Sequence, residues 1–263
     1  MENHNFKKKF GQNFLTDTNL LSAIVRDAGV DSQDCVVEIG MGQGALTEQL
    51  SNKAKRVYGF EIDLELKDFL EKKFKNSNVV LFFEDILSYD ITKLESQISG
   101  DYKVVANIPY YITTPIIFYF LEKSNAKSLC LMVQKEVAEK IVAKYKTKNY
   151  GVLSVICQSF CECKIKRIVS KKLFTPSPKV DSAIISLIIK QKFDFEYSKF
   201  VRSCFSMRRK TLANNISSNY GLTKTQIEEI LKSNDYNVSI RAEELDVDNF
   251  KKLFEVFRQN LRK

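Results

Sequence analysis

A four-residue run, Asn107-Ile108-Pro109-Tyr110, combines residue types that suit one particular reaction. An amide side chain, a turn restricted by proline and an aromatic ring follow directly after the apolar residues 104–106. The exocyclic amine of adenine is a poor nucleophile because its lone pair is delocalised into the ring. The Asn107 side-chain oxygen and a nearby backbone carbonyl can accept its N–H bonds and aim the lone pair at a methyl donor. The run therefore predicts methylation of an adenine amine, with Tyr110 stacked on the base.

Alternating strand and helix patterns surround this run from about residue 34 to residue 189. Short β-rich segments at 35–39, 56–61, 79–83, 102–106 and 128–133 are separated by helix-like segments. This alternation is typical of a mostly parallel sheet covered by helices. Two further strand-like runs follow without a full helix between them, and they can form an antiparallel pair at one edge of the sheet. These runs are residues 161–168 and 182–189.

Groups that bind nucleosides stand at the ends of four successive predicted strands. Gly40 and Gly42 follow the first strand and let the backbone approach a ligand. Glu61 ends the second strand, where an acid can bind both ribose hydroxyls of an adenosine cofactor, and Asp85 follows the third. Alone, the run at Asn107 is more typical of an ordinary turn. Its place at the end of the fourth strand, in one crevice with these groups, favours the methylation hypothesis.

The identity of the cofactor follows from what the crevice lacks. Gly40, Gly42 and Ala45 also match the dinucleotide pattern G-x-G-x-x-A, so a nicotinamide enzyme is an alternative. Such an enzyme needs a second nucleotide site and a hydride acceptor, and the sequence shows neither. S-adenosylmethionine fits better, because its sulfonium activates the methyl group and leaves the protein mainly to supply position and charge complementarity.

Several motifs stand in a fixed order along the chain. They are GQNFL at 11–15, EIGMGQG at 38–44, NIPY at 107–110 and FTPSPKVDSA at 174–183, with RRKTL at 208–212 and RAEEL at 241–245 in the tail. Together they closely resemble the small-subunit (16S) ribosomal RNA adenine N(6),N(6)-dimethyltransferase family. The resemblance covers nearly the whole chain, from Phe10 to about Leu253.

The resemblance implies a fold and an activity. The fold is an α/β, Rossmann-like class I methyltransferase sheet with helices on both faces at 1–190, whose N-terminal segment covers the cofactor. A small all-helical domain at 191–263 is expected to dock rRNA. The activity is S-adenosylmethionine-dependent transfer of four methyl groups to two adjacent adenosines. These adenosines lie in a hairpin loop near the 3′ end of small-subunit rRNA, and the transfer takes place during small-subunit biogenesis.

The resemblance also implies roles for individual residues. Ile108 stands where leucine is frequent in the family, which changes little if its backbone carbonyl acts. Phe174 lies in a proline-rich loop, and we expect it to be partly exposed. The expected catalytic residues are Asn107, Ile108, Pro109 and Tyr110; the expected cofactor contacts are Asn13, Leu15, Gly40, Gly42, Glu61, Asp85 and Asn107; Tyr110 and Phe174 are expected to sandwich the base.

The charge of the chain indicates a polyanionic partner. The net charge is +9 and the pI is about 9.1, which suits nucleic acid or an anionic membrane surface. Residues 164–179 carry six Lys and Arg residues and no acidic residue. We expect Lys171, Lys172, Arg208 and Arg209 to contact RNA phosphates. Taken with this charge, the family resemblance implies the rRNA of an immature 30S-type small subunit as the partner.

Other classes of protein are disfavoured by what the sequence contains. No apolar run approaches the ~20 residues that span a bilayer, and the first ten residues hold no apolar signal core, so we expect a cytoplasmic protein without a membrane partner. The six cysteines lack zinc-site spacing and are expected to be reduced core thiols. His4 is the only histidine, so neither a metal site nor a Cys–His or Ser–His pair is expected. The apolar stripe on 250–261 predicts helical core, and a monomer satisfies all of these features.

Two alternatives stay open at this point. The first is the related large-subunit rRNA adenine dimethyltransferase of the macrolide-resistance type, which shares the fold and the Asn-x-Pro-Tyr turn. Residues 11–15 and 111–115 look more like the small-subunit group. The second is a mainly non-catalytic assembly factor that uses the fold as an RNA platform. The intact Glu61, Asp85, Asn107 and Tyr110 argue against a loss of catalysis.

Overall fold

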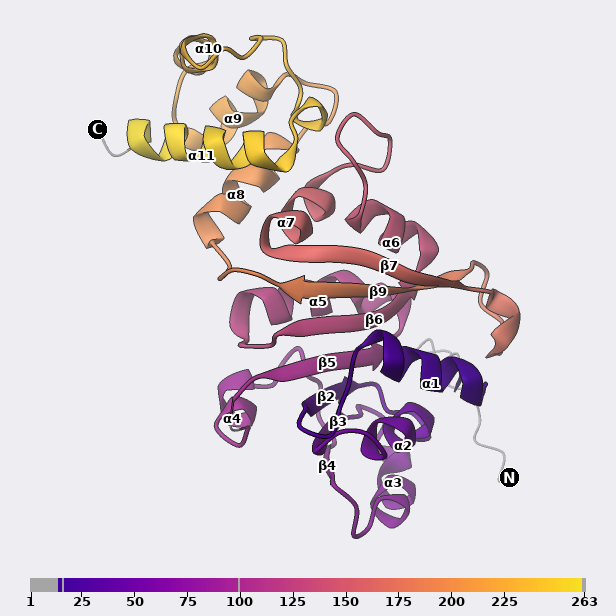
Figure 1. The fold of residues 1–263 in the computed structure, drawn as a ribbon. Helices are drawn as coiled ribbons and strands as arrows, with labels where there is room; N and C mark the ends of the chain where they lie inside the picture. Colours follow the sequence, from indigo (N-terminus) through magenta and orange to yellow (C-terminus); the bar gives the residue numbers. More distant parts are fainter. Residues whose placement is uncertain (1–13, 16, 99, 262–263) are drawn as a thin grey trace. The chain divides into compact units, whose positions relative to one another are not determined.

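A computed structural model describes residues 14–15, 17–98 and 100–261 of the chain (Figure 1). Contacts between backbone positions divide the chain into two compact units. Among the described residues, the sheet unit comprises those up to 138 and 162–190, and the helical unit comprises 139–161 and 191–261.

A seven-stranded mixed sheet forms the centre of the sheet unit, with the strand order β4-β3-β2-β5-β6-β9-β7. The first five strands in this order run parallel to one another, namely β4, β3, β2, β5 and β6. β9 pairs with β6 in the antiparallel sense. A separate two-stranded ladder joins β1 to β8. The strands are β1 (Phe14–Leu15), β2 (Cys35–Ile39), β3 (Arg56–Phe60), β4 (Val79–Phe82), β5 (Tyr102–Asn107), β6 (Ser128–Gln134), β7 (Cys161–Val169), β8 (Phe174–Thr175) and β9 (Ser182–Ile189).

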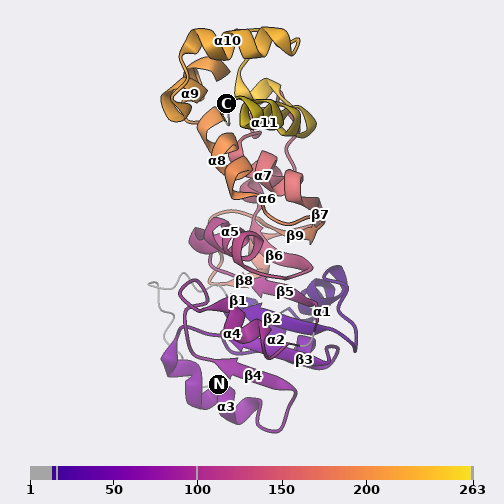
Figure 2. The same cartoon turned by 90° about the vertical axis from the view of Figure 1, so that its left-hand side faces the viewer.

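Helices cover both faces of the sheet because the strand residues alternate in direction. Val105 packs in a buried cluster with α1 and α2, whereas Tyr102, three residues earlier, donates its hydroxyl to Glu95 of α4, 2.8 Å away. Figure 2 shows α1 and α4 on opposite sides of the strands. The predicted Rossmann-like sheet with helices on both faces is confirmed. The helices of this unit are α1 (Thr18–Asp27), α2 (Ala45–Ser51), α3 (Lys67–Lys73), α4 (Ile91–Glu95) and α5 (Thr113–Lys123), and α6 (Lys135–Ile141) crosses the boundary.

The last two predicted strands lie at one edge of the sheet, as expected. The sequence did not predict which of the two forms the edge, and the structure shows it. β9 is inserted between β6 and β7, so the strand that comes last in sequence is buried, while β7 forms the edge. The residue types agree with this order. β9 (SAIISLII) is almost entirely apolar and buried, whereas β7 (CECKIKRIV) alternates charged and apolar residues, as a strand at a sheet edge does.

The helical unit is built around aromatic side chains from α8 and α11. Phe200 of α8 packs against Phe254 and Phe257 of α11, with ring centroids 5.6 and 5.5 Å apart. Phe250, Leu253, Phe254 and Phe257 are buried, so the predicted helical stripe is confirmed as core over these four residues. The helices of this unit are α7 (Val152–Phe160), α8 (Phe195–Cys204), α9 (Leu212–Tyr220), α10 (Lys224–Ser233) and α11 (Val247–Leu261).

The helical unit contains a segment that the predicted boundary at residue 190 assigned to the sheet domain. Residues 139–161 pack with the helical unit because α7 is apolar and contacts both α8 and α11. The ring centroids of Phe160 of α7 and Phe193 lie 4.7 Å apart. The Ser159 and Tyr197 hydroxyls share a 2.8 Å hydrogen bond. Contacts thus group this segment with residues 191–263, whereas the prediction placed it with residues 1–190.

Candidate active site

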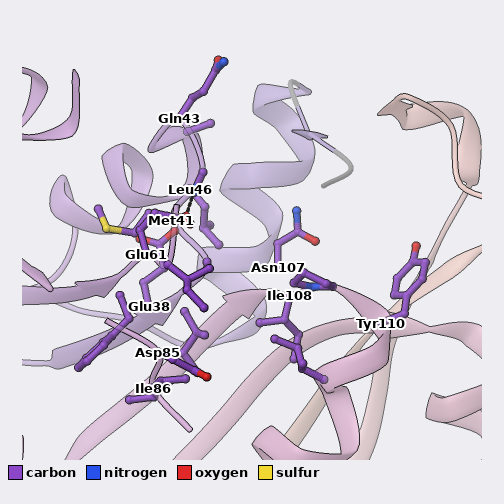
Figure 3. Close-up of a pocket in the computed structure, with 18 of the residues that line it drawn as sticks. Glu38, Met41, Gln43, Leu46, Glu61, Asp85, Ile86, Asn107, Ile108 and Tyr110 are labelled. Atoms are coloured by element: carbon purple, nitrogen blue, oxygen red, sulfur yellow. Dashed lines mark hydrogen bonds between the residues drawn. The ribbon is translucent and has the colours of Figure 1, made fainter. Parts of the chain in front are cut away.

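A pocket of about 270 Å³ opens where the parallel strands β2, β3 and β5 end. The chain order reverses here, since β3 lies on one side of β2 and β5 on the other, and such a switch point is where α/β sheets bind ligands. Figure 3 shows Glu38, Glu61 and Asp85 gathered on one side, with Asn107 and Tyr110 on the other. The residues that line the pocket are Leu21, Glu38 to Gln43, Ala45, Leu46, Phe60, Glu61, Ile62, Glu84 to Leu87, Asn107 to Ile112 and Phe174.

The glycine loop is shaped for close approach of a ligand. Gly40 and Gly42 have φ angles of 72° and 54°, in the left-handed region that favours glycine. The Gly40 N–H donates to the Phe60 carbonyl at 2.8 Å, and the Gly42 N–H donates to Oε2 of Glu61 at 2.7 Å. The loop is thus fixed to the end of β3, so the two predicted cofactor-binding segments form one structural unit.

Glu61 is buried, with 4% of its surface exposed, and is held by backbone donors. Oε1 accepts the N–H of Asp63 at 2.9 Å, while Oε2 accepts that of Gly42. Burial raises the pKa of Glu61 above its ordinary value, and these backbone hydrogen bonds oppose the rise. A carboxylate has about four acceptor sites on its two oxygens, and the backbone donors of Asp63, Gly42 and Ile62 leave room for a further donor from a ligand. The site therefore suits a hydroxyl-bearing ligand.

Glu38 is a site residue that the sequence analysis missed. It is the next-to-last residue of β2, is 1% exposed and lines the pocket, and its Oε2 has no hydrogen-bond partner among the described residues. Burial raises the pKa of Glu38 to about 8, and the nearby charge of Glu61 adds to the rise. The signal in the sequence was a single acid within an apolar strand, directly before the glycine loop. A buried carboxyl oxygen without a partner is rare unless a ligand pairs with it.

This buried acid makes the stability of the ligand-free protein depend on pH. The folded-state pKa of about 8 exceeds the ordinary value of 4.5, so the folded protein binds the extra proton. The stabilisation of the folded state by this proton is complete below pH 4.5, and it is lost as the pH rises through about 8. We expect wild type to lose stability relative to Glu38→Gln over this range, by about 1.4 kcal/mol for each unit of pKa difference. Urea unfolding of both proteins at pH 5 and pH 8 measures it, and a stability difference that does not change with pH would contradict it.

The predicted substrate residues lie at the end of β5 and directly after it. Asn107 is the last residue of β5 and is half-buried, and Ile108 is buried beside it. Asp85 is exposed at the rim, where its Oδ1 accepts the Leu87 N–H at 3.0 Å. The structure therefore brings Asn107, Ile108, Pro109 and Tyr110 into the same pocket as Gly40, Gly42, Glu61 and Asp85.

Tyr110 is oriented by a partner that the sequence analysis did not identify. Its hydroxyl forms a 2.7 Å hydrogen bond with Oγ of Ser182, the first residue of β9. Burial raises the pKa of the Tyr110 hydroxyl, and the Ser182 hydrogen bond opposes the rise. The phenol is therefore neutral at physiological pH, and its ring has a fixed direction at the pocket wall.

Phe174 corrects one prediction, because it is buried at 4% exposure rather than partly exposed. β8 pairs with β1, and the Phe174 side chain packs into the core cluster that includes Leu20 and Ile24 of α1. The proline-rich loop begins only after this residue. Phe174 still lines the pocket, so its role in stacking stays a prediction.

The remaining predicted residues are placed as follows. Asn13 lies outside the described residues, and for Leu15 the structure describes only the backbone pairing of β1 with β8. Lys171 and Lys172 are exposed in the turn before β8. Among the described residues, no group of three or more His, Cys, Asp or Glu side chains is placed to hold a metal ion.

The two predicted arginines lie in the helical unit and differ in their contacts. Arg209 is exposed. Arg208 pairs with Glu243 at 3.4 Å and donates to the Lys148 carbonyl at 2.7 Å.

Comparison with known proteins identifies the family of this chain. A model of the ribosomal RNA adenine dimethylase family matches residues 3–259. The chain belongs to this family. Over 269 residues it is 42% identical to ribosomal RNA small subunit methyltransferase A of Enterococcus faecalis, which covers 97% of this chain and 91% of that protein. The protein of the same name from Mycoplasma mobile is 42% identical over 257 residues, covering 95% and 98%.

Solved structures of the same kind share the fold. A dimethyladenosine transferase from Plasmodium falciparum superimposes with a TM-score of 0.79 at 29% identity, covering 94% of this chain and 98% of that one. The 23S rRNA methyltransferase ErmE gives a TM-score of 0.71 at 26% identity, covering 94% and 100%. The protein is an rRNA adenine dimethyltransferase, and membership of this family implies S-adenosylmethionine as the methyl donor. The helices in the described part of the chain are all too short or too polar to span a bilayer.

Proposed function

We propose that this protein dimethylates two adjacent adenosines in a hairpin loop near the 3′ end of small-subunit rRNA, while the subunit is being assembled in the cytoplasm. The relatives at 42% identity over almost the whole chain carry a small-subunit name, whereas the match to the 23S enzyme is at 26%. This difference favours small-subunit over large-subunit rRNA. The substrate is an immature 30S-type particle, and a monomer is sufficient for the chemistry described below.

The residues on the strand ends fit S-adenosylmethionine. The open loop at Gly40 and Gly42 would admit its methionine part, Glu61 would accept the two ribose hydroxyls, and Asp85 would accept the adenine amine. The unpartnered carboxyl oxygen of Glu38 suits a positively charged ligand. Asn13 and Leu15 would close over the bound molecule from the N-terminal segment. When bound, the cofactor supplies a methyl group activated by a sulfonium.

The Asn107 side-chain oxygen and the Ile108 carbonyl would orient the target amine. Accepting its two N–H bonds favours a pyramidal nitrogen with the lone pair directed at the methyl donor. After the first transfer the amine keeps one N–H, so one carbonyl is enough to orient it for the second. Proline at 109 limits the turn, which keeps both acceptors in place. An in-line attack of this kind requires no covalent enzyme intermediate.

The target base would lie against Tyr110. The hydrogen bond from the Tyr110 hydroxyl to Ser182 sets the direction of the tyrosine ring, so the stacking surface exists before the base arrives. Phe174 forms part of the pocket wall and would meet the opposite face of a base that enters fully. Lys171 and Lys172 would contact phosphates outside the pocket, and the helical unit would dock rRNA through Arg209.

One observation carries this proposal. A single pocket is lined both by two buried acids, Glu38 near the end of β2 and Glu61 directly after β3, and by the Asn-Ile-Pro-Tyr turn at the end of β5. The test is transfer of labelled methyl groups from S-adenosylmethionine to unmethylated small subunits, with large subunits and fully methylated small subunits as controls. We expect incorporation into unmethylated small subunits alone. Incorporation into large subunits alone would favour the 23S-type alternative, and none at all, with the cofactor bound, would favour a binding-only assembly factor.

A further inference from the structure

The helical unit presents an exposed loop between α6 and α7 whose sequence is Lys144-Tyr145-Lys146-Thr147-Lys148, called the basic loop below (Figure 1). All five side chains are exposed, and Tyr145 retains 43% of its surface. The Nζ of Lys146 lies 5.4 Å from the centre of the Tyr145 ring. The basic loop therefore exposes three lysine cations and one aromatic ring within five residues.

The basic loop is anchored at both ends. Before it, Gln158 of α7 donates to the carbonyls of Ile141 and Ala143 at 2.7 and 2.9 Å. After it, Tyr150 is buried and its ring packs edge-on against Phe205, 6.3 Å away. Inside the loop, the Thr147 hydroxyl donates to the Lys144 carbonyl at 2.6 Å. These contacts give the loop a defined shape despite its exposure.

The middle of the loop is held by the segment around Glu243. The Lys146 N–H donates to the Glu243 carbonyl at 2.8 Å, and Lys146 adopts φ 64°, which side chains with a Cβ rarely adopt. Arg208 completes the arrangement, since its guanidinium donates to the Lys148 carbonyl at 2.7 Å and pairs with Glu243 at 3.4 Å. The Arg208 guanidinium therefore bonds both to the basic loop and to Glu243, whose backbone supports the loop.

We propose that the basic loop is a phosphate-contacting surface for rRNA, and that Arg208 acts mainly by holding this loop in place. The inference rests on the proposed function, because it takes rRNA as the substrate. It extends the predicted RNA contacts from the segment at 208–210 to a part of the chain some sixty residues earlier, Lys148 being 60 residues from Arg208. Lys146 and Lys148 would face phosphates, and Tyr145 can stack on an unpaired base.

The chemistry of the surface favours RNA over an acidic protein. Arg209 and Lys210 are exposed next to Arg208, so the cations continue beyond the loop itself. A row of exposed lysines is what a phosphate backbone requires, and an exposed ring among them is typical of proteins that bind unpaired nucleotides. Positioning the lysines beforehand lowers the entropy lost on binding.

The test compares binding of unmethylated small subunits at several KCl concentrations. The variants are Lys146→Ala with Lys148→Ala, Arg208→Ala, and all three changes together. A matched control, Lys232→Ala with Lys252→Ala, removes the same charge from exposed positions on α10 and α11. We expect the loop variant to bind roughly tenfold more weakly at physiological salt, and its salt slope to fall by about 1.5, because each lost phosphate contact removes 0.7 to 0.9. The control should change little.

The combined variant decides the role of Arg208. If Arg208 holds the loop, Arg208→Ala weakens binding and the triple variant is little worse than the loop variant. Effects that simply multiply would mean that Arg208 contacts RNA itself, which overturns the positioning role. A loop variant that binds like the control overturns the whole inference, as does a loss seen with subunits but absent with protein-free rRNA. Methylation by the wild-type protein, measured first, separates these outcomes from a failure of the proposed function.

Discussion

Replacing Asn107 by alanine is expected to reduce the rate of methyl transfer by about 10²- to 10³-fold, since a positioned polar group that acts on developing charge contributes about 2.7–4 kcal/mol. The change removes the side-chain oxygen at the end of β5 while the backbone of Ile108 stays in place. Single-turnover transfer to unmethylated small subunits, with saturating S-adenosylmethionine, measures the effect directly. Cofactor affinity should change far less, by tenfold at most, because Asn107 is only one of several predicted contacts.

A matched control separates this effect from damage to the fold. Asn125→Ala removes an exposed asparagine that bonds to Glu95 in the same unit, and transfer should be retained. If Asn107→Ala transfers methyl groups as fast as this control, the orienting role is contradicted. Asn107→Ala also tests the alternative role as an assembly factor. If this variant is catalytically inactive, still binds subunits and stalls their maturation in cells, release of the protein depends on methylation.

The second large effect is expected at Glu61. Glu61→Ala should raise the dissociation constant for S-adenosylmethionine by about 10²-fold or more, because hydrogen bonds to a charged group contribute about 1.5–3 kcal/mol each. The buried carboxylate also accepts the N–H groups of Gly42 and Asp63, so its removal loosens the glycine loop as well. Calorimetric titration with the cofactor measures the affinity, and Glu61→Gln, which keeps one acceptor, should fall between wild type and alanine.

The control for Glu61 is an acid of the same type on the surface. Glu71→Ala on α3 removes an exposed side chain that pairs with Lys67, and exposed pairs contribute little. Its cofactor affinity should match that of wild type. Tight cofactor binding by Glu61→Ala, in a protein that unfolds normally, would mean that the acid serves the loop rather than the ribose.

The arrangement of the strand ends could be predicted because it depends on local patterns. Strands buried on both faces form short apolar runs, and the polar residues that follow each run mark its carboxyl end. Glu61, Asp85 and Asn107 were located in this way, and the structure places all three on one pocket. The parallel order then followed from the alternation with helices.

Burial by distant partners could not be predicted. Phe174 is hidden because β8 pairs with β1, about 160 residues earlier, and because α1 packs over it. The Ser182 partner of Tyr110 is likewise set by β9, a strand distant in sequence. Glu38 looked like any residue of an apolar strand until its burial and its missing partner were visible. The assignment of α7 to the helical unit depends on Phe160 meeting Phe193, a contact that periodicity does not encode.

The most direct test of the account is to locate and count the methyl groups on rRNA after complete reaction with unmethylated small subunits. Mass spectrometry of nuclease fragments gives both the position and the degree of methylation. The account predicts one fragment of small-subunit rRNA, near its 3′ end, that carries two adjacent N6,N6-dimethyladenosines. Monomethylated adenosine as the final product, a single modified position, or dimethyladenosine in large-subunit rRNA would contradict it.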